Sequence, residues 1–416
     1  MKKILFALLF FPLLVFAQKN DFIDKIDDEA IRSLRFYPDI FSQNPSLLPP
    51  VVALGNNLLL EFDRLGTETM RYTVKIASCT ADWQESQLME SEFLNTFNEF
   101  YIQDYESSFN TKIPYVHYRF RLKDIKASGN YVLRVFDDYG KQVICRRFMV
   151  YENLVGISSS FGNITGAEQA FRNQQIDFLI NHNSLDIPNP MEQIKVVIRQ
   201  NFRWENAITN LKPTFVKSYQ RELVYNYFNM ENTFQGGNEF RLFDGRSFQS
   251  RGINVDQLVL LPEGNQVRLS TDRNRNGMVY NRIFEDLDGQ FYIQKLESAQ
   301  HNAEADYGYF LFSLYAEEPA NGKVILSGAF TDWEISQKYE MEYDNEEKMY
   351  KKQVLLKQGY YNYCYVLTDN SYQNADYIFW EGSHQLTKNS YEILVYYRPF
   401  GSRNEKLIAY KSFIKQ

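Results

Sequence analysis

Histidines are the side chains best suited to acid–base or metal chemistry, and in this sequence they are few and scattered. His117, His182, His301 and His384 each stand alone, without a second histidine at the spacing of a metal site. Gly-x-Ser-x-Gly, His-Glu-x-x-His, phosphate-loop and paired-carboxylate motifs do not occur. We therefore predict a protein that is not an enzyme, with no catalytic residue, no cofactor and no metal site. His117 lies on the polar side of a predicted strand, where a surface or paired histidine is expected.

One segment matches a calcium-binding loop in part. The run Asp272-Arg273-Asn274-Arg275-Asn276-Gly277 begins like an EF-hand loop, but position twelve, which should be a bidentate glutamate, is Ile283. Two arginines would lie inside the cation site, and no helical pattern flanks it. We therefore predict a β-turn here instead of a calcium site.

The sequence contains three cysteines, Cys79, Cys145 and Cys364, with no Cys-x-x-Cys spacing. An odd number cannot pair fully within one chain. Cys79 and Cys145 each lie in or beside a predicted strand, so either one disulfide joins them or all three are buried thiols that pack as small apolar residues.

The segment 232–244 joins paired glycines to alternating aromatic and charged residues. Paired glycines permit a tight bend or a close approach of two backbones. Two interpretations are open: a hairpin connection, or a loop presented to a protein partner. The candidate partner-binding residues are Phe234, Gly236, Gly237, Asn238, Glu239, Phe240 and Arg241.

The N-terminus has the pattern of a cleaved signal peptide. Lys2 and Lys3 precede an apolar run, Ile4 to Phe16, and Ala17 places a small residue before Gln18. The run is shorter than the ~20 apolar residues that cross a bilayer, and no cysteine follows it to carry a lipid. We expect residues 1–17 to be removed and the protein to be exported to the periplasm.

The charge balance limits the classes of partner. The chain has 45 Lys and Arg against 52 Asp and Glu, a formal net charge of −7. An acidic chain does not suit nucleic acid or anionic membrane surfaces, both of which attract clustered Lys and Arg. No other segment is apolar enough to span a membrane. We therefore expect neither a nucleic-acid partner nor a direct membrane span.

Apolar and polar residues alternate at period two along most of the chain, which predicts an all-β fold of two to three tandem β-sandwich domains. A glutamate- and proline-containing turn near residues 317–322 suggests the start of a third unit. We expect a signal peptide at 1–17, an N-terminal β-sandwich at 18–152, a second β domain at 153–316 and a C-terminal β-sandwich at 317–416. The predicted strands are 58–63, 70–79, 115–122, 131–136, 141–150, 175–180, 194–200, 258–261, 291–296, 307–315, 323–327, 349–356, 360–367 and 391–397.

Several unusual segments together resemble the plug protein family of the type IX secretion system of Bacteroidota, in order and spacing from about Asp27 to Leu407. They include Cys79-Thr80-Ala81-Asp82-Trp83, Tyr105-Glu106-Ser107-Ser108-Phe109-Asn110-Thr111, Ser128-Gly129-Asn130-Tyr131, Gly236-Gly237-Asn238-Glu239-Phe240-Arg241 and Asp286-Leu287-Asp288-Gly289. The resemblance implies a periplasmic, non-enzymatic protein. Such a protein caps the inner opening of the large outer-membrane translocon barrel and is held at the outer membrane through that barrel.

The last domain resembles the early-set immunoglobulin-like fold of glycogen-binding domains, through 324–333 and 355–363. In those domains exposed tryptophans stack on glucose rings. Here Trp333 corresponds to a position that is mostly packed in those domains. Trp380 is the remaining candidate for a tryptophan that stacks on a sugar. With 30 Tyr and 33 Phe in the chain, the alternative function is an exported carbohydrate-binding protein that uses exposed aromatic rings. The pore plug remains the preferred hypothesis, and a carbohydrate partner is not expected.

Overall fold

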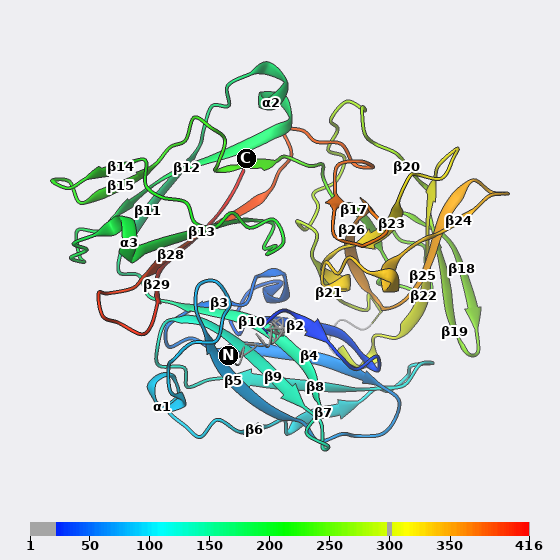
Figure 1. Cartoon of the computed structure of the whole chain (residues 1–416). Coiled ribbons are helices and arrows are strands. Elements are labelled where there is room, and N and C mark those ends of the chain that lie inside the picture. The colour runs from blue at the N-terminus through cyan, green and yellow to red at the C-terminus, as the bar shows by residue number, and fades with distance from the viewer. Residues whose placement is uncertain (1–21, 298–301, 416) are drawn as a thin grey trace, which may run out of the picture.

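The computed structural model describes residues 22–297 and 302–415 and consists mainly of β-strands (Figure 1). The all-β prediction is confirmed. Three groups of strands are visible: blue to cyan, green with red, and yellow to orange. The predicted signal peptide lies outside the described residues. Within the described part of the chain, no helix is both long and apolar enough to cross a bilayer.

The first sandwich is formed by strands before residue 152. One sheet has the order β1-β10-β9-β5-β6, with β3 parallel to β10, and the facing sheet has the order β2-β4-β8-β7. Aromatic residues dominate the core between them, including the stacked pair Tyr131 and Phe148. The strands are β1 (Lys25–Ile26), β2 (Ile31–Pro38), β3 (Val51–Ala53), β4 (Leu58–Leu65), β5 (Thr73–Cys79), β6 (Phe100–Tyr101), β7 (Asp104–Ser107), β8 (Tyr115–Leu122), β9 (Gly129–Phe136) and β10 (Gln142–Tyr151).

The second sandwich combines segments that are distant in the sequence. Its sheets have the orders β11-β12-β15-β14, with β16 beside β12, and β13-β28-β29. Its core brings together residues from both, such as Phe178, Tyr225 and Tyr391. The strands are β11 (Gly156–Phe161), β12 (Asn173–Asn181), β13 (Ile194–Gln200), β14 (Phe215–Lys217), β15 (Glu222–Tyr225), β16 (Thr233–Gln235), β28 (Ser390–Tyr397) and β29 (Lys406–Ile414).

In the third sandwich, a sheet of order β18-β19-β22-β25-β24 packs against a sheet of order β17-β26-β21. β20 joins the first of these through β22, and β23 and β27 join the second through β26. Phe243, Phe310, Phe312 and Tyr361 lie in the core between them. The strands are β17 (Arg241–Asp244), β18 (Val255–Leu261), β19 (Gly264–Leu269), β20 (Asp272–Arg273), β21 (Phe291–Ile293), β22 (Tyr307–Tyr315), β23 (Lys323–Ser327), β24 (Glu342–Asp344), β25 (Met349–Lys357), β26 (Gly359–Thr368) and β27 (Ala375–Asp376).

Strand pairing crosses the domain boundary expected at residues 316 and 317. β22 pairs with β25 along its whole length, from Tyr307 opposite Lys357 to Tyr315 opposite Met349. β28 and β29 return to the second sandwich, where β28 pairs with β13. The turn at 317–322 connects two sheets of one sandwich, so its proline and glycine mark an internal loop. We propose the division 22–152, 153–235 with 389–415, and 238–388.

Helices are short and lie at connections. They are α1 (Glu90–Phe93), α2 (Ala167–Arg172), α3 (Pro190–Gln193) and the 3-10 turns η1 (Pro45–Leu47), η2 (Asn302–Glu304), η3 (Ala329–Thr331) and η4 (Gln337–Tyr339). Four predicted strands, 115–122, 194–200, 307–315 and 323–327, match the structure residue for residue. The predicted strand 291–296 ends at Ile293, and β29 was not predicted.

The first and second sandwiches pack face to face. β9 and β10 contribute Val132 and Met149 to a shared apolar core, against Leu394 and Tyr396 of β28. The position of Trp83, just after the end of the predicted strand 70–79, predicts a largely buried side chain. Trp83 lies in the same core and is 5% exposed, which confirms this prediction. Its ring meets that of Trp204 edge to face at 4.9 Å, so an aromatic pair closes this junction.

Candidate functional site

Buried charges join the first and third sandwiches. Asp63 on β4 and Lys357 at the end of β25 form an ion pair of 2.6 Å, and both side chains are 1% exposed. Tyr307 donates its hydroxyl to the same carboxylate at 2.7 Å, and His117 Nδ1 lies 2.6 Å from its other oxygen. Because charges removed from water must be paired, this network fixes how the two sandwiches sit together. His117 is thus a paired histidine, one of the two alternatives expected.

The pKa values of this network follow from burial and pairing. Burial alone would lower the pKa of His117, but its hydrogen bonds with Asp63 and Glu61 outweigh burial and raise it. Burial alone would raise the pKa of Asp63, but Lys357 and His117 hold it below its ordinary value. Burial lowers the pKa of Lys357, and Asp63 only partly offsets this. Within this network the charged side chains stabilise one another, so we assign the network a structural role.

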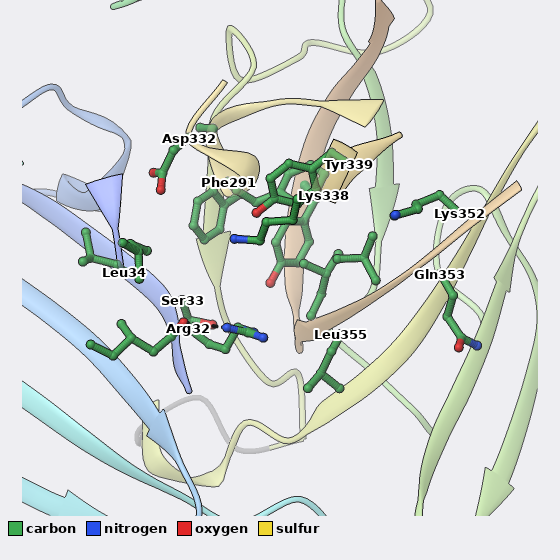
Figure 2. A pocket seen from close by; sticks show the side chains of 17 residues that line it. Arg32, Ser33, Leu34, Phe291, Asp332, Lys338, Tyr339, Lys352, Gln353 and Leu355 are labelled. Carbon is green, nitrogen blue, oxygen red and sulfur yellow. Dashed lines mark hydrogen bonds between the residues drawn. The ribbon is translucent and has the colours of Figure 1, made fainter. Parts of the chain in front are cut away.

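A cavity of about 190 Å³ lies between β2 and the third sandwich. Figure 2 shows Arg32 from β2 facing Lys338 and Tyr339 of η4, with Lys352 of β25 on the other side. Asp332 is the acidic residue of the lining, and on the far side of the wall it pairs with Arg146 of β10 at 2.8 Å. This cavity is basic in an otherwise acidic chain.

The predicted loop 234–241 lies at the junction of the second and third sandwiches. Phe234, a candidate partner-binding residue, is 5% exposed and packs against Tyr391 in the core, so its ring is not displayed at the surface. A Cβ on Gly236 would lie 2.1 Å from the carbonyl oxygen of His384. The close backbone approach that the glycines permit is therefore made within the chain. Gly237, Asn238 and Phe240 are partly exposed, while Glu239 and Arg241 are buried.

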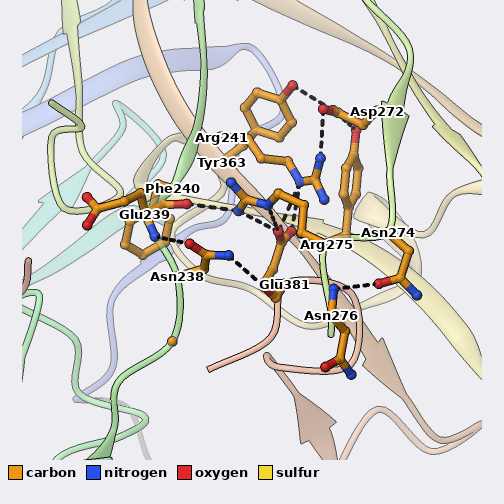
Figure 3. A network of polar contacts seen from close by, with 12 residues as sticks. Asn238, Glu239, Phe240, Arg241, Asp272, Asn274, Arg275, Asn276, Tyr363 and Glu381 are labelled. Atoms are coloured by element: carbon orange, nitrogen blue, oxygen red, sulfur yellow. Dashed lines mark hydrogen bonds and ion pairs between the residues drawn. The ribbon is translucent and has the colours of Figure 1, made fainter. Parts of the chain in front are cut away.

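Arg241 is the centre of a second ion network (Figure 3). Its guanidinium binds Glu381 at 2.9 Å and Asp272 at 2.8 Å, and Arg275 binds the same Glu381 carboxylate at 2.6 Å. Burial would raise the pKa of Glu381, but the two arginines outweigh burial and lower it to about 2. Tyr363 also donates to Asp272. The predicted partner-binding arginine therefore stabilises the third sandwich itself.

The partial calcium loop is a turn, as predicted. Its first residue, Asp272, belongs to β20 and is bound by Arg241 and by the hydroxyls of Tyr363 and Tyr365. Across residues 22–297 and 302–415, no group of three or more His, Cys, Asp or Glu side chains is placed to hold a metal ion. All three cysteines are buried thiols, and burial raises the pKa of Cys79 and of Cys364 to about 12.

The segments that are hydrogen-bonded to the loop carry exposed apolar side chains. Gly236 and Gly237 bind the backbone of Arg172 and His384, Gln385 binds that of Phe171, and Tyr280 donates to Glu239. The segments tied together in this way expose a set of large apolar residues that sequence analysis did not single out. We call this set the apolar patch: Phe171, Met278, Val279, Ile283, Phe284 and Leu386.

The two tryptophans considered for carbohydrate binding do not form an exposed, flat surface on which a sugar could stack. Trp380, the remaining candidate, is 4% exposed and lies in the core of the third sandwich. Trp333 packs edge to face on Phe240 at 5.7 Å, and the Arg203 guanidinium lies 4.5 Å from its ring centre. A sugar ring stacked on Trp380 would require that side chain to leave the core.

Comparison with known proteins gives two informative matches. A family model described as the first domain of the type 9 secretion system plug protein matches residues 31–152, the first sandwich from β2 to β10. A crystal structure of a hypothetical protein from Parabacteroides merdae ATCC 43184 shares 31% sequence identity and a TM-score of 0.88, covering 95% of this chain and 99% of that chain. The two proteins therefore share their architecture over nearly their full lengths.

Two further comparisons add no functional information. Salmonella alpha-2-macroglobulin reacted with methylamine matches with 9% identity and a TM-score of 0.17, over 94% of this chain and 24% of that chain, which is too low to indicate a shared fold. No curated protein matches the sequence. Taken with the all-β architecture and the motifs of the first sandwich, the family match and the full-length relative show that the chain belongs to the type 9 secretion system plug protein family.

Proposed function

We propose that this protein is a periplasmic plug, which binds and seals the periplasmic opening of the type IX translocon barrel. It keeps the outer membrane impermeable when no substrate is exported and is held at that membrane through the translocon. The observation that carries the proposal is the family match of the first sandwich. Membership of a plug family with an all-β fold also favours a role in binding over catalysis, and the protein acts without a cofactor.

Rigidity supports this role. A protein that closes a wide pore must keep its domains in a fixed arrangement, so that solutes do not pass around it. The buried Asp63–Lys357 pair joins the first sandwich to the third, and the Trp83–Trp204 pair joins the first to the second. Buried polar contacts and a shared apolar core resist the hinge motion that small, polar domain interfaces permit.

The contact surface that we propose is the apolar patch, with the loop 234–241 as its support. Val279 is 91% exposed and Phe171 is 75% exposed. Apolar side chains that cluster on a protein surface commonly mark a binding site for another protein, and aromatic residues often anchor such interfaces. The partner is the rim of the translocon barrel. Asn238 and Phe240 of the supporting loop are partly exposed.

A permeability assay tests the proposal. Deleting the gene should raise uptake of a large antibiotic that the outer membrane normally excludes, while secretion continues. Wild-type protein and Tyr139→Asp, which alters an exposed ring of the first sandwich, should restore the barrier and co-purify with the barrel. Val279→Asp with Ile283→Asp should do neither, although the protein still folds.

The possible outcomes of this assay test the plug function and the proposed contact surface separately. If the deletion strain stays as resistant as its parent and the protein never co-purifies with the translocon, the plug function is wrong. If the double variant restores the barrier as well as Tyr139→Asp does, the plug function stands and the apolar patch is not its contact surface.

A further inference from the structure

A second cavity, of about 260 Å³, opens at the junction of the second and third sandwiches. The loop 233–240 forms one wall. Asn206 and Ile208 close it from the second sandwich, and Tyr377 and Ile378 close it from the third. Its volume is just below the range of small-molecule sites, roughly 300–1,000 Å³, and would hold a molecule about the size of one sugar ring.

Four polar atoms of the lining residues lack hydrogen-bond partners. They are Oε2 of Glu239, Oγ1 of Thr233, Oδ1 of Asn206 and the hydroxyl oxygen of Tyr377, each buried and without a partner among the described residues. Glu239 is the most informative, because the residue is only 6% exposed. Its other oxygen receives the Tyr280 hydroxyl and the Lys388 amide. Buried polar atoms are rarely left unsatisfied in native proteins, so these four indicate a missing hydrogen-bonding partner.

The charges and rings of the wall define the chemistry of that partner. Arg275 is paired with Glu381 and Arg203 with Glu205, and Arg203 also lies over the Tyr377 ring at 3.9 Å. The lining therefore contains two arginines and two glutamates, Glu239 and Glu381, so its formal charges cancel. All four unsatisfied atoms can accept hydrogen bonds, and the Tyr377 hydroxyl can also donate one, so the occupant must supply several donors. Phe240 and Tyr377 add apolar ring surface to the wall.

We propose that this cavity binds a small, neutral, hydroxyl-rich molecule of monosaccharide size. Its hydroxyls donate to Glu239, Thr233 and Asn206, and its C–H surface packs on the rings of Phe240 and Tyr377. The site differs from a surface platform of exposed tryptophans, because its polar groups are recessed between two sandwiches. The inference does not depend on the plug function, because the cavity and its acceptors belong to this chain alone.

The test is binding of a panel of glucose, galactose, mannose, N-acetylglucosamine and myo-inositol to the full mature protein. Saturation-transfer NMR detects contact, and the melting temperature reports stabilisation by ligand. We expect at least one of the five to bind saturably. Glu239→Gln should weaken its Kd roughly tenfold or more, since a charge-assisted hydrogen bond is lost, and Thr233→Val should weaken it severalfold. Thr271→Val, which alters an exposed hydroxyl, should leave Kd unchanged.

The same variants provide a control for correct folding. Without ligand, Thr233→Val should unfold at or above the wild-type temperature, because it removes an unsatisfied hydroxyl. Three results would overturn the proposal: no member of the panel binds; binding is equal in Thr233→Val and Thr271→Val; or a crystal structure soaked in the panel shows only water in the cavity.

Discussion

The ion pair between Lys357 and Asp63 gives the sharpest test of how the sandwiches are held together. The substitution Lys357→Met keeps much of the side-chain volume and removes the charge. Asp63 is then left in a site where it is 1% exposed, bound by the Tyr307 hydroxyl and by His117. Removing one partner of a buried pair costs roughly 3–5 kcal/mol in the free energy of unfolding. We expect a loss of about 3 kcal/mol near pH 6, because protonated His117 still faces the carboxylate.

The loss should grow as pH rises. The pKa of His117 is raised in the folded protein, so its stabilising contribution is complete below its unfolded pKa of about 6.5 and is lost as pH rises through the folded value. In wild type, Asp63 is also paired with Lys357. In Lys357→Met no cation remains beside Asp63 once His117 has lost its proton. The difference between variant and wild type should therefore approach the upper end of the range, about 5 kcal/mol, at a pH above the folded pKa of His117.

Equilibrium unfolding in urea, followed by tryptophan fluorescence, measures both quantities. Lys217→Met is the matched control, because Lys217 pairs with Glu222 at 3.1 Å but is 46% exposed. It should cost ~0–1 kcal/mol. The double variant Asp63→Asn with Lys357→Met should be more stable than Lys357→Met alone, since no unpaired charge stays buried. If Lys357→Met behaves like Lys217→Met at both pH values, the buried pair does not join the sandwiches as we describe.

Three further predictions concern other parts of the fold. Trp83→Ala should cost ~3–5 kcal/mol in chemical denaturation, while Tyr139→Ala, at an exposed ring, should cost little; equal effects would place Trp83 at the surface. Gly236→Ala should cost about 3 kcal/mol, since its Cβ would meet the His384 carbonyl oxygen at 2.1 Å. Gly237→Ala should cost about 1 kcal/mol for its positive φ, and the reverse order in thermal unfolding would contradict the packing of this loop. Glu381 has a pKa lowered to about 2, so it contributes ~3 kcal/mol above its unfolded pKa of about 4.3, and this is lost as pH falls toward 2. The gap in unfolding free energy between wild type and Glu381→Gln should therefore narrow from pH 5 to pH 2.5, and a constant gap would refute the assignment.

Much of the local structure can be predicted from the residues alone. The period-two alternation at 115–122 and 307–315 specifies strands, because one face of each must be apolar to be buried. It also predicted the burial of Trp83 and the turn at Asp272–Gly277. The motifs of the first sandwich are long and unusual, so the residues alone indicated the family.

The partners of the strands, and the contacts between distant residues, are set by the folding of the whole chain. The alternation of β28 shows that it is a strand, but it does not show that its partner is β13, which lies far earlier in the chain. That pairing depends on long-range hydrogen bonds and a shared core, neither of which can be read from the turn at 317–322. In the same way, Phe234 and Arg241 were expected at a surface, because their burial depends on Tyr391 and Glu381, which arrive from distant segments.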